Sequence, residues 1–340
     1  MRLFFVLILS YSSDKINTKY EGGIRMKFMV GLQFANKAFT DFIIENKEHI
    51  NEVYFSWSDF PNGRSNQLMD SDLLPWQMQR LQTDTLELLN NSGIKMNVLF
   101  NANCYGAQSL SWHLFEKVGK TVDFLKNRYS LTSVTTTSPL IAKFVKANFN
   151  DIELRASVNM EIGSTEGMEY LLDYFDSFYL KRELNRDLDK ISELSDFAAS
   201  NGKKLYALAN SGCLNNCSAH NFHDNLVAHE AEISQMNNAY EFNGICKEFL
   251  KKEENLKKLA QYTNFIRPED ISKYDTLFYA VKLATRVHKN PETVLKSYIN
   301  QKYAGNILDI LEPAHSIYPY VLENGEPLRL VKLDDAFMYK

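Results

Sequence analysis

The feature that most restricts the fold of this 340-residue chain is a regular alternation of short apolar segments with amphipathic ones. Eight apolar segments rich in strand-forming residues follow one another, and helical patterns separate most of them. Alternation of strand and helix predicts a parallel sheet, and eight repeats predict closure into an α/β fold of the (β/α)8 TIM type. The predicted strands are 28–34, 52–55, 95–100, 133–135, 154–158, 177–180, 204–208 and 263–266.

Helical periodicity fills the first six gaps between these strands. In the sixth gap, Leu188, Ile191, Leu194 and Phe197 lie on one apolar stripe, and Gly202 follows the end of the pattern. The predicted helices are 36–50, 76–91, 112–126, 139–147, 165–174 and 188–200, with 273–286 and 292–303 after the eighth strand. No GxGxxG sequence follows the first strand, which argues against a doubly wound dinucleotide-binding sheet.

The sequence divides into three parts. Residues 1–25 are interpreted as a loose or over-extended N-terminus, 26–290 as the barrel, and 291–340 as a short C-terminal helical or extended appendage. The apolar run from Leu3 to Leu9 resembles a short signal-peptide core, but the residues after it are a poor match to a cleavage site. The run is too short to cross a bilayer, so no membrane attachment is expected.

Composition agrees with an ordinary globular protein, since 45% of the residues are apolar and 24% are charged. The net charge of −4 gives no overall basic field of the kind that attracts nucleic acid. Four cysteines in a chain of this size do not form the framework of a disulfide-stapled secreted domain. They favour a metal or redox role in a reducing compartment, so a cytoplasmic location is expected.

Polar residues follow each predicted strand at its carboxyl end. Active sites of (β/α)8 barrels lie on that face, so these residues are expected to surround one site. They are Gln33, Asp59, Asn101, Asn103, Thr136, Thr137, Ser138, Asn159, Glu161, Lys181, Arg182, Glu183, Asn210, Ser211, Arg267, Glu269 and Asp270. For any single position, the alternative is an ordinary polar loop.

The connection after the seventh strand is the longest, a predicted insertion of nearly fifty residues that begins at Cys213. Long loops between strand and helix usually carry function. Cys104 follows the third strand, and Cys213, Cys217 and Cys246 follow the seventh, so all four thiols can meet above one barrel mouth. Four thiolates favour an iron–sulfur cluster or zinc, and the spacing alone leaves the metal open. The alternative for a single cysteine is an inert core residue.

The same connection contains three histidines, of which His220 and His223 follow the cysteine pair most closely. They are candidate ligands or hydrogen-bond donors to the ligands. A peptidase would need a nucleophile such as Cys213 paired with His220, because the chain contains neither GxSxG nor HExxH.

Arginines near the predicted strand ends are candidates for binding an anionic substrate. Arg182 and Arg267, together with Lys181, can bind a carboxylate, which the guanidinium fork matches in geometry. The alternative is that these cations form ion pairs with the acidic residues beside them.

Several motifs occur in the order found in the peptidase U32-like family, which this chain resembles from about residue 26 to residue 311. The motifs are GCLNNC (212–217), FH (222–223), FIRPEDI (265–271) with Tyr274, KLATR (282–286) and GN (305–306). The resemblance implies a TIM barrel with a [4Fe-4S] cluster on four cysteines, here Cys104, Cys213, Cys217 and Cys246. Arg267, Glu269 and His223 lie within these motifs, and together with Arg182 they are the candidate catalytic residues.

The function that the resemblance implies is redox chemistry or oxygen-independent hydroxylation of a small molecule or an RNA base. Two alternatives are a non-catalytic subunit that carries the cluster for a second U32-like partner, and a collagenase-like peptidase. Zinc remains the alternative to the [4Fe-4S] cluster.

Overall fold

The computed structural model describes residues 26–57, 60–63, 74–313, 322–323 and 326–327, and it confirms the predicted barrel. Eight parallel strands follow one another around a closed ring, and β1 pairs with both β2 and β8. They are β1 (Phe28–Gly31), β2 (Ile50–Ser56), β3 (Met96–Phe100), β4 (Leu131–Thr136), β5 (Glu153–Ala156), β6 (Ser177–Tyr179), β7 (Lys204–Leu208) and β8 (Ala280–Leu283). A two-stranded antiparallel piece, β9 (Leu322–Glu323) with β10 (Glu326–Pro327), lies outside the barrel.

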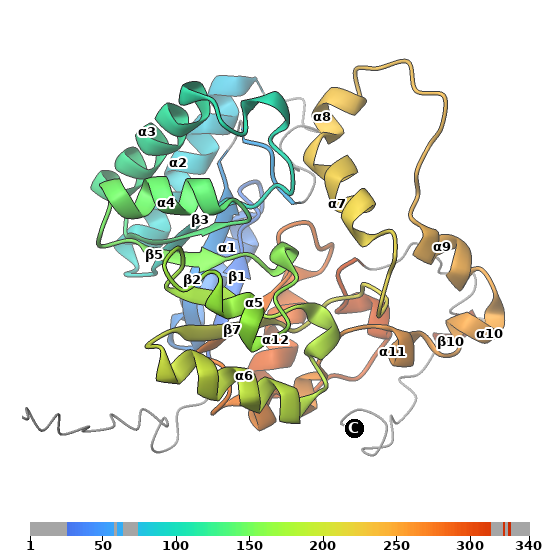
Figure 1. Cartoon of the computed structure of the whole chain (residues 1–340). Helices are drawn as coiled ribbons and strands as arrows, with labels where there is room; N and C mark the ends of the chain where they lie inside the picture. The colour runs from blue at the N-terminus through green and yellow to red at the C-terminus, as the bar shows by residue number, and fades with distance from the viewer. Residues whose placement is uncertain (1–25, 58–59, 64–73, 314–321, 324–325, 328–340) are drawn as a thin grey trace, which may run out of the picture.

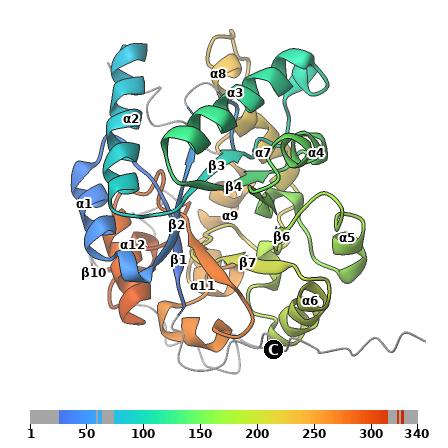
Figure 2. The same cartoon turned by 90° about the vertical axis from the view of Figure 1, so that its left-hand side faces the viewer.

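Helices cover the outside of the ring, as Figure 2 shows for α1, α2, α3, α4, α6 and α12. The helices between β1 and β7 are α1 (Lys37–Glu45), α2 (Pro75–Asn91), α3 (Trp112–Arg128), α4 (Pro139–Asn148), α5 (Thr165–Glu169) and α6 (Leu188–Ser200). Helix α4 begins as predicted, with proline in its first turn and the Ser138 hydroxyl accepting from the Ile141 N–H at 3.3 Å. Helix α5 ends five residues earlier than predicted.

Alternate residues of each strand face opposite sides of the ring and build two cores. Outward-facing side chains such as Val30, Val53 and Val98 are fully buried beneath the helices. Inward-facing side chains such as Tyr54 and Tyr179 form a second, smaller cluster inside the barrel. Complete burial of each side chain of this kind contributes roughly 1.5–3 kcal/mol, so the outer core supplies most of the hydrophobic stabilisation.

The prediction of the eighth strand is wrong. Strand β8 is Ala280–Leu283, within the segment 273–286 that was expected to be a helix. The segment 263–266 instead lies beside the end of β7, where the Ile266 N–H donates to the Ala209 carbonyl at 2.8 Å and Thr263 forms an isolated bridge with Leu214. A short apolar run fits either a strand or a buried loop, and only its long-range pairing distinguishes the two.

After β8 the chain turns into α12 (Pro291–Asn300), which packs against α1. The Thr285 hydroxyl joins the two ends of the ring, because it accepts from the Gly31 N–H at 2.8 Å and donates to the Gly31 carbonyl at 2.9 Å. The proposed domain boundaries stay predictions. Residues 1–25, most of 314–340 and the candidate Asp59 lie outside the described residues.

The connection from β7 to β8 forms an excursion on one side of the barrel, coloured yellow to orange in Figure 1. It contains α7 (His220–Ala228), α8 (Glu230–Ile233), α9 (Ile245–Leu250), α10 (Glu253–Leu256) and α11 (Leu259–Tyr262). A 3-10 helix, Pro268–Tyr274, leads from the excursion back toward β8. Within the described part of the chain, no helix combines the length and apolar character that crossing a membrane requires.

Candidate active site at the barrel mouth

A cavity of ≈ 50 Å³ lies among the carboxyl ends of the strands, on the face where barrels of this type carry their chemistry. Its wall combines apolar side chains with charged and amide groups from strands distant in sequence. The polar side chains are Asn101, Asn159, Arg182, Lys282, Arg286 and Glu312. The structure therefore brings Arg182 and several of the predicted strand-end residues to one place.

Arg182 opens a 3-10 helix just after β6, and its side chain is only 3% exposed. Its Nη2 atom lies 3.3 Å from Glu161 Oε1, 2.5 Å from His220 Nε2 and 3.4 Å from Asn159 Oδ1. Asp224 Oδ2 is 3.9 Å from the same nitrogen and 3.3 Å from the His220 ring. Arg182 is thus held by groups from two segments, the turn after β5 and α7.

Glu161 belongs to the same network, and its protonation depends on Arg182. Burial raises the pKa of the Glu161 carboxyl, but the hydrogen bond from His220 and the positive charge of Arg182 outweigh burial and lower the pKa overall. The carboxylate form is therefore the stable one beside this guanidinium.

Cys213 follows β7 and receives a hydrogen bond from Arg182, whose Nη1 lies 3.3 Å from the thiol sulfur. Two bonds from Asn264 to the Cys213 carbonyl, both 3.1 Å, hold the backbone. Next to it, Gly212 passes so close to the C-terminal segment that a Cβ atom would lie 2.2 Å from the Pro313 carbonyl oxygen. A side chain at position 212 would displace the loop that carries Cys213, so glycine is required there.

Cys217 and Cys246 are electrostatic neighbours of Cys213. Burial raises the pKa of the Cys246 thiol, and the charges of Cys213 and Cys217 raise it further. Cys246 is the second residue of α9, and the Cys217 carbonyl accepts from the first N–H of α7 at 3.0 Å. The excursion thus returns to the pair of thiols at its own beginning, and three of the four predicted ligands lie near one another.

Cys104 has different neighbours. A hydrogen bond with His229 and another from the Gly106 N–H, at 3.3 Å, lower the pKa of its thiol. His229 follows the last residue of α7, and its Nδ1 atom lies 3.2 Å from the Glu232 carboxylate. The bond to Cys104 raises the pKa of His229. Cys104 therefore contacts the C-cap residue of α7, whereas His220 of the Arg182 network is the first residue of that helix.

The set of four cysteine ligands stays a prediction, and the contacts of Cys104 are with His229. Among the residues that the structure describes, no group of three His, Cys, Asp or Glu side chains is arranged to hold a metal ion. All four thiols are free and partly exposed.

The structure places the other predicted site residues away from the cavity wall. Arg267 forms an ion pair with Asp270, on the 3-10 helix that precedes β8. Glu269 accepts a hydrogen bond of 2.7 Å from a backbone N–H beyond α12. The His223 ring packs edge-on against an aromatic ring of the excursion, at 5.6 Å between centroids. Because 263–266 is not a barrel strand, the strand-end argument no longer supports Arg267 or Glu269, and their roles stay predictions.

Sequence reasoning missed Lys282 and Arg286, which β8 and its following loop bring to the cavity. The sequence signal that identifies this position is the KLATR stretch (282–286), which contributes to the family resemblance. Its assignment to a helix hid the position, because a helix would not place Lys282 inside the ring. Asp224, on α7, was missed as well, since nothing in its local sequence distinguishes it from a surface acid.

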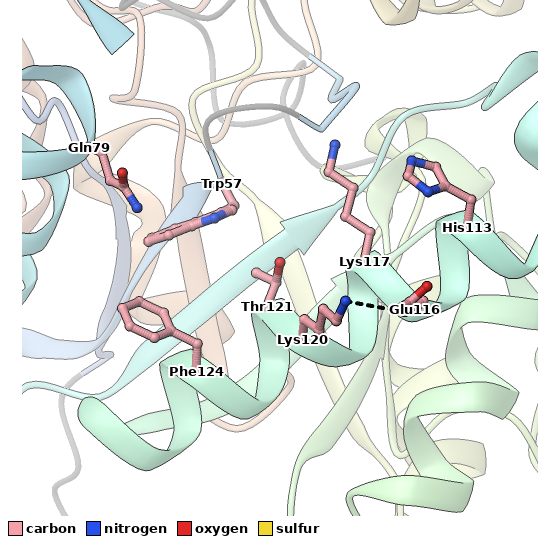
Figure 3. Close-up of a pocket in the computed structure, with 8 residues that line it drawn as sticks. All are labelled: Trp57, Gln79, His113, Glu116, Lys117, Lys120, Thr121 and Phe124. Carbon is pink, nitrogen blue, oxygen red and sulfur yellow. Dashed lines mark hydrogen bonds and ion pairs between the residues drawn. The ribbon is translucent and has the colours of Figure 1, made fainter. Parts of the chain in front are cut away.

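A second hollow, of ≈ 490 Å³, lies on the outside of the molecule between α2 and α3 (Figure 3). Trp57 and Phe124 form its aromatic side, with ring centroids 5.8 Å apart. Lys120 on its rim is paired with Glu116 at 2.6 Å, the dashed line in Figure 3. None of the four thiols lines this groove, and the barrel mouth remains the candidate site.

Comparison with known proteins gives a consistent picture of the chain's relatives. No family model matches it. The uncharacterized protease MJ1657 of Methanocaldococcus jannaschii is 26% identical over 240 residues, which span 68% of each chain. The solved structure of the U32 peptidase Mk0906 matches with a TM-score of 0.51 and 14% identity, over 66% of this chain and 84% of that one. These matches support a U32-family assignment.

A weaker structural match to this U32-like chain is an Oleispira antarctica phosphodiesterase, OLEI02445, in complex with the product sn-glycerol-3-phosphate. It has a TM-score of 0.38 and 15% identity, over 62% of this chain and 90% of that one. A likeness of this size supports no inference about the site.

Proposed function

We propose that this protein is a U32-like iron–sulfur enzyme that carries out redox chemistry or oxygen-independent hydroxylation at the barrel mouth. Its substrate would be a small molecule or an RNA base. The observation that supports the proposal is that the charges of Cys213 and Cys217 act on the Cys246 thiol, while Arg182 donates a hydrogen bond to the Cys213 sulfur.

The donor set fits a [4Fe-4S] cluster in its chemistry. Cys213, Cys217 and Cys246 are soft thiolate donors of the kind that iron–sulfur clusters require, and they come from the beginning and the middle of the excursion. Zinc, which also binds thiolates, is the alternative. Cys104 would be the fourth ligand of the predicted set, although its contacts join it to His229.

The cluster, when bound, would supply one-electron transfer. The chain's own residues would control its surroundings. Arg182 donates a hydrogen bond to the Cys213 sulfur, and hydrogen bonds to the sulfurs tune the potential of a cluster. His220 links Arg182 to Glu161, because its Nε2 accepts from the guanidinium and its Nδ1 lies 3.2 Å from the Glu161 carboxylate.

Anaerobic purification of the full chain tests this proposal. We expect a brown protein with iron and acid-labile sulfide, and with an EPR signal after reduction. Cys213→Ala, Cys217→Ala and Cys246→Ala should each lose most of the iron. Cys104→Ala is the matched comparison, because retention of iron would remove Cys104 from the ligand set and leave the three-thiol core. A colourless protein with stoichiometric zinc would overturn the iron–sulfur assignment.

A peptidase is the second candidate, because MJ1657 is named a protease and Mk0906 a peptidase. The observation that favours it is the Cys104, His229 and Glu232 arrangement, in which a thiol of lowered pKa lies beside a histidine oriented by a carboxylate. Cysteine nucleophiles are activated in this way. Under this alternative, Cys104→Ala and His229→Ala should abolish peptide hydrolysis while Cys213→Ala retains it. Loss in Cys213→Ala alone would move the nucleophile to Cys213, and no hydrolysis by the wild type would contradict a peptidase.

A further inference from the structure

Lys282 is a buried cation that the proposed cluster chemistry does not use. It lies on β8, points into the top of the barrel and is only 8% exposed. Its Nζ atom is 4.0 Å from the centroid of the Tyr54 ring and 5.3 Å from that of Tyr179. The aromatic faces stabilise an ammonium group that has lost most of its contact with water. Lys282 therefore places a positive charge at the bottom of the mouth cavity. The inner core contains apolar and aromatic side chains at neighbouring positions.

Arg286 lines the same cavity as Lys282, four residues further along the chain. One carboxylate, Glu312, lines the cavity with them. Arg182 also faces the cavity, but Glu161 and Asp224 already balance its charge. Lys282 and Arg286 bring two positive charges to this wall, and Glu312 brings one negative charge.

Two amides complete the polar wall. The Asn101 side-chain oxygen accepts from the Gly63 N–H at 3.3 Å, and the Asn159 oxygen accepts from Arg182 at 3.4 Å. These bonds use the amide oxygens, which leaves the NH2 groups as the donors that the amides can offer. The cavity is thus lined mainly by groups that donate hydrogen bonds, which is the requirement for binding an oxyanion.

The volume limits what can enter. A cavity of ≈ 50 Å³ has room for roughly four water molecules, which is about the size of a carboxylate or phosphate group and too small for an aromatic ring system. We propose that the mouth cavity binds the carboxylate or phosphate head of a small-molecule substrate, with Lys282 and Arg286 as the binding cations. As a statement about the substrate class, this inference rests on the proposed function, because Arg182 joins the cavity to Cys213.

Binding can be measured by calorimetry on the full-length protein with two probes, inorganic phosphate and succinate, at constant ionic strength. Loss of a hydrogen bond between charged groups should weaken binding by roughly ten- to a hundredfold, so we expect that loss in Lys282→Met and in Arg286→Met. Lys289→Met is the control, because Lys289 is exposed on the same loop and should bind like the wild type. Preference for phosphate or for succinate identifies the head group, and either preference supports the site.

Arg286→Lys guards against a variant that fails to fold, because it keeps the charge and should retain part of the affinity. Two results would overturn the inference: no binding of either probe below about 10 mM, or equal binding by the wild type, Lys282→Met and Arg286→Met. The same titration on Cys213→Ala separates this inference from the proposed function. Anion binding without iron in any variant would refute the cluster alone, and iron without anion binding would refute the cavity alone.

Discussion

Buried charged side chains have different kinds of partner at the two ends of the barrel interior. Near the amino ends of the strands, Arg155 is 1% exposed and lies between Glu52, with which it forms a short ion pair, and Glu153, at 2.9 Å. Lys204 bonds to Glu153 at 2.6 Å, and Arg155 stacks on the Tyr206 ring at 4.0 Å. Two cations and two carboxylates neutralise one another there, so the network needs no external partner.

The mouth also contains a buried arginine, Arg182, but this arginine contacts a thiol and lines a cavity. Arg182 bonds to a thiol as well as to carboxylates, and its neighbours Lys282 and Arg286 face a cavity. A buried charge is costly unless it is paired. The lower network is enclosed by its own partners and stabilises the fold, whereas Lys282 and Arg286 line a cavity that a small ligand can enter.

The largest expected effect comes from removing the arginine of the lower network. Arg155→Met leaves Glu52 buried without its partner, so the free energy of unfolding should fall by about 3–5 kcal/mol. Arg182→Met should lose less, about 1–3 kcal/mol, because Glu161 is partly exposed and His220 still contacts it. Urea unfolding measures both. Equal losses would break the distinction between the two ends.

Acid should weaken the lower network next. Burial raises the pKa of Glu153, but the charges of Arg155 and Lys204 outweigh burial and lower it from 4.5 to about 2. A carboxyl whose pKa is lower in the folded state stabilises the protein above its unfolded pKa. That contribution, about 3 kcal/mol, is lost as the pH falls from 4.5 through 2.

Urea unfolding between pH 7 and pH 2 measures this loss. Glu153→Gln should remove most of the pH dependence, whereas Glu193→Gln, at an exposed pair with Lys190, should not. An unchanged pH profile in Glu153→Gln would show that other carboxyls dominate acid unfolding.

A smaller effect is expected at the loop that carries Cys213. Gly212→Ala forces a methyl group against the Pro313 carbonyl, so the free energy of unfolding should fall by about 1–3 kcal/mol. Iron content should fall as well, because the thiol moves with the loop. Gly167→Ala is the control, since its new methyl group meets only an ordinary contact of 3.5 Å in α5. Normal stability and iron in Gly212→Ala would show that the C-terminal segment does not position the thiol.

The smallest effect distinguishes the thiols of the mouth from one another. His229 lowers the pKa of Cys104, whereas burial and neighbouring thiols raise that of Cys246. In metal-free protein at pH 7, Cys104 should therefore react faster with iodoacetamide than Cys246 does. His229→Ala should move the pH midpoint of Cys104 alkylation upward and leave Cys246 unchanged. Peptide mass spectrometry across a pH series measures this, and a midpoint unaffected by His229→Ala would refute the pairing.

Much of the fold could be predicted from local pattern, because strand and helix periods repeat over a few residues. Seven of the eight strands were placed correctly, and β7 has the predicted bounds 204–208. The eighth strand prediction is wrong because β8 lies within 273–286, whose apolar residues also suit a helix, and its pairing with β1 and β7 depends on contacts distant in sequence. Local sequence does not reveal that Lys282 points inward and is stabilised by two aromatic rings.

The sequence by itself determined that this chain forms a barrel and that Cys213 and Cys217 lie close together, because both follow from periodicity and short spacing. Only the tertiary structure decided that Cys246 joins this pair, that Cys104 pairs with His229, and that Lys282 and Arg286 share a cavity with Arg182. The physical reason is that these contacts depend on how the long excursion and the ring closure pack. This packing depends on many contacts between residues that are distant in sequence, and a local sequence pattern does not contain that information.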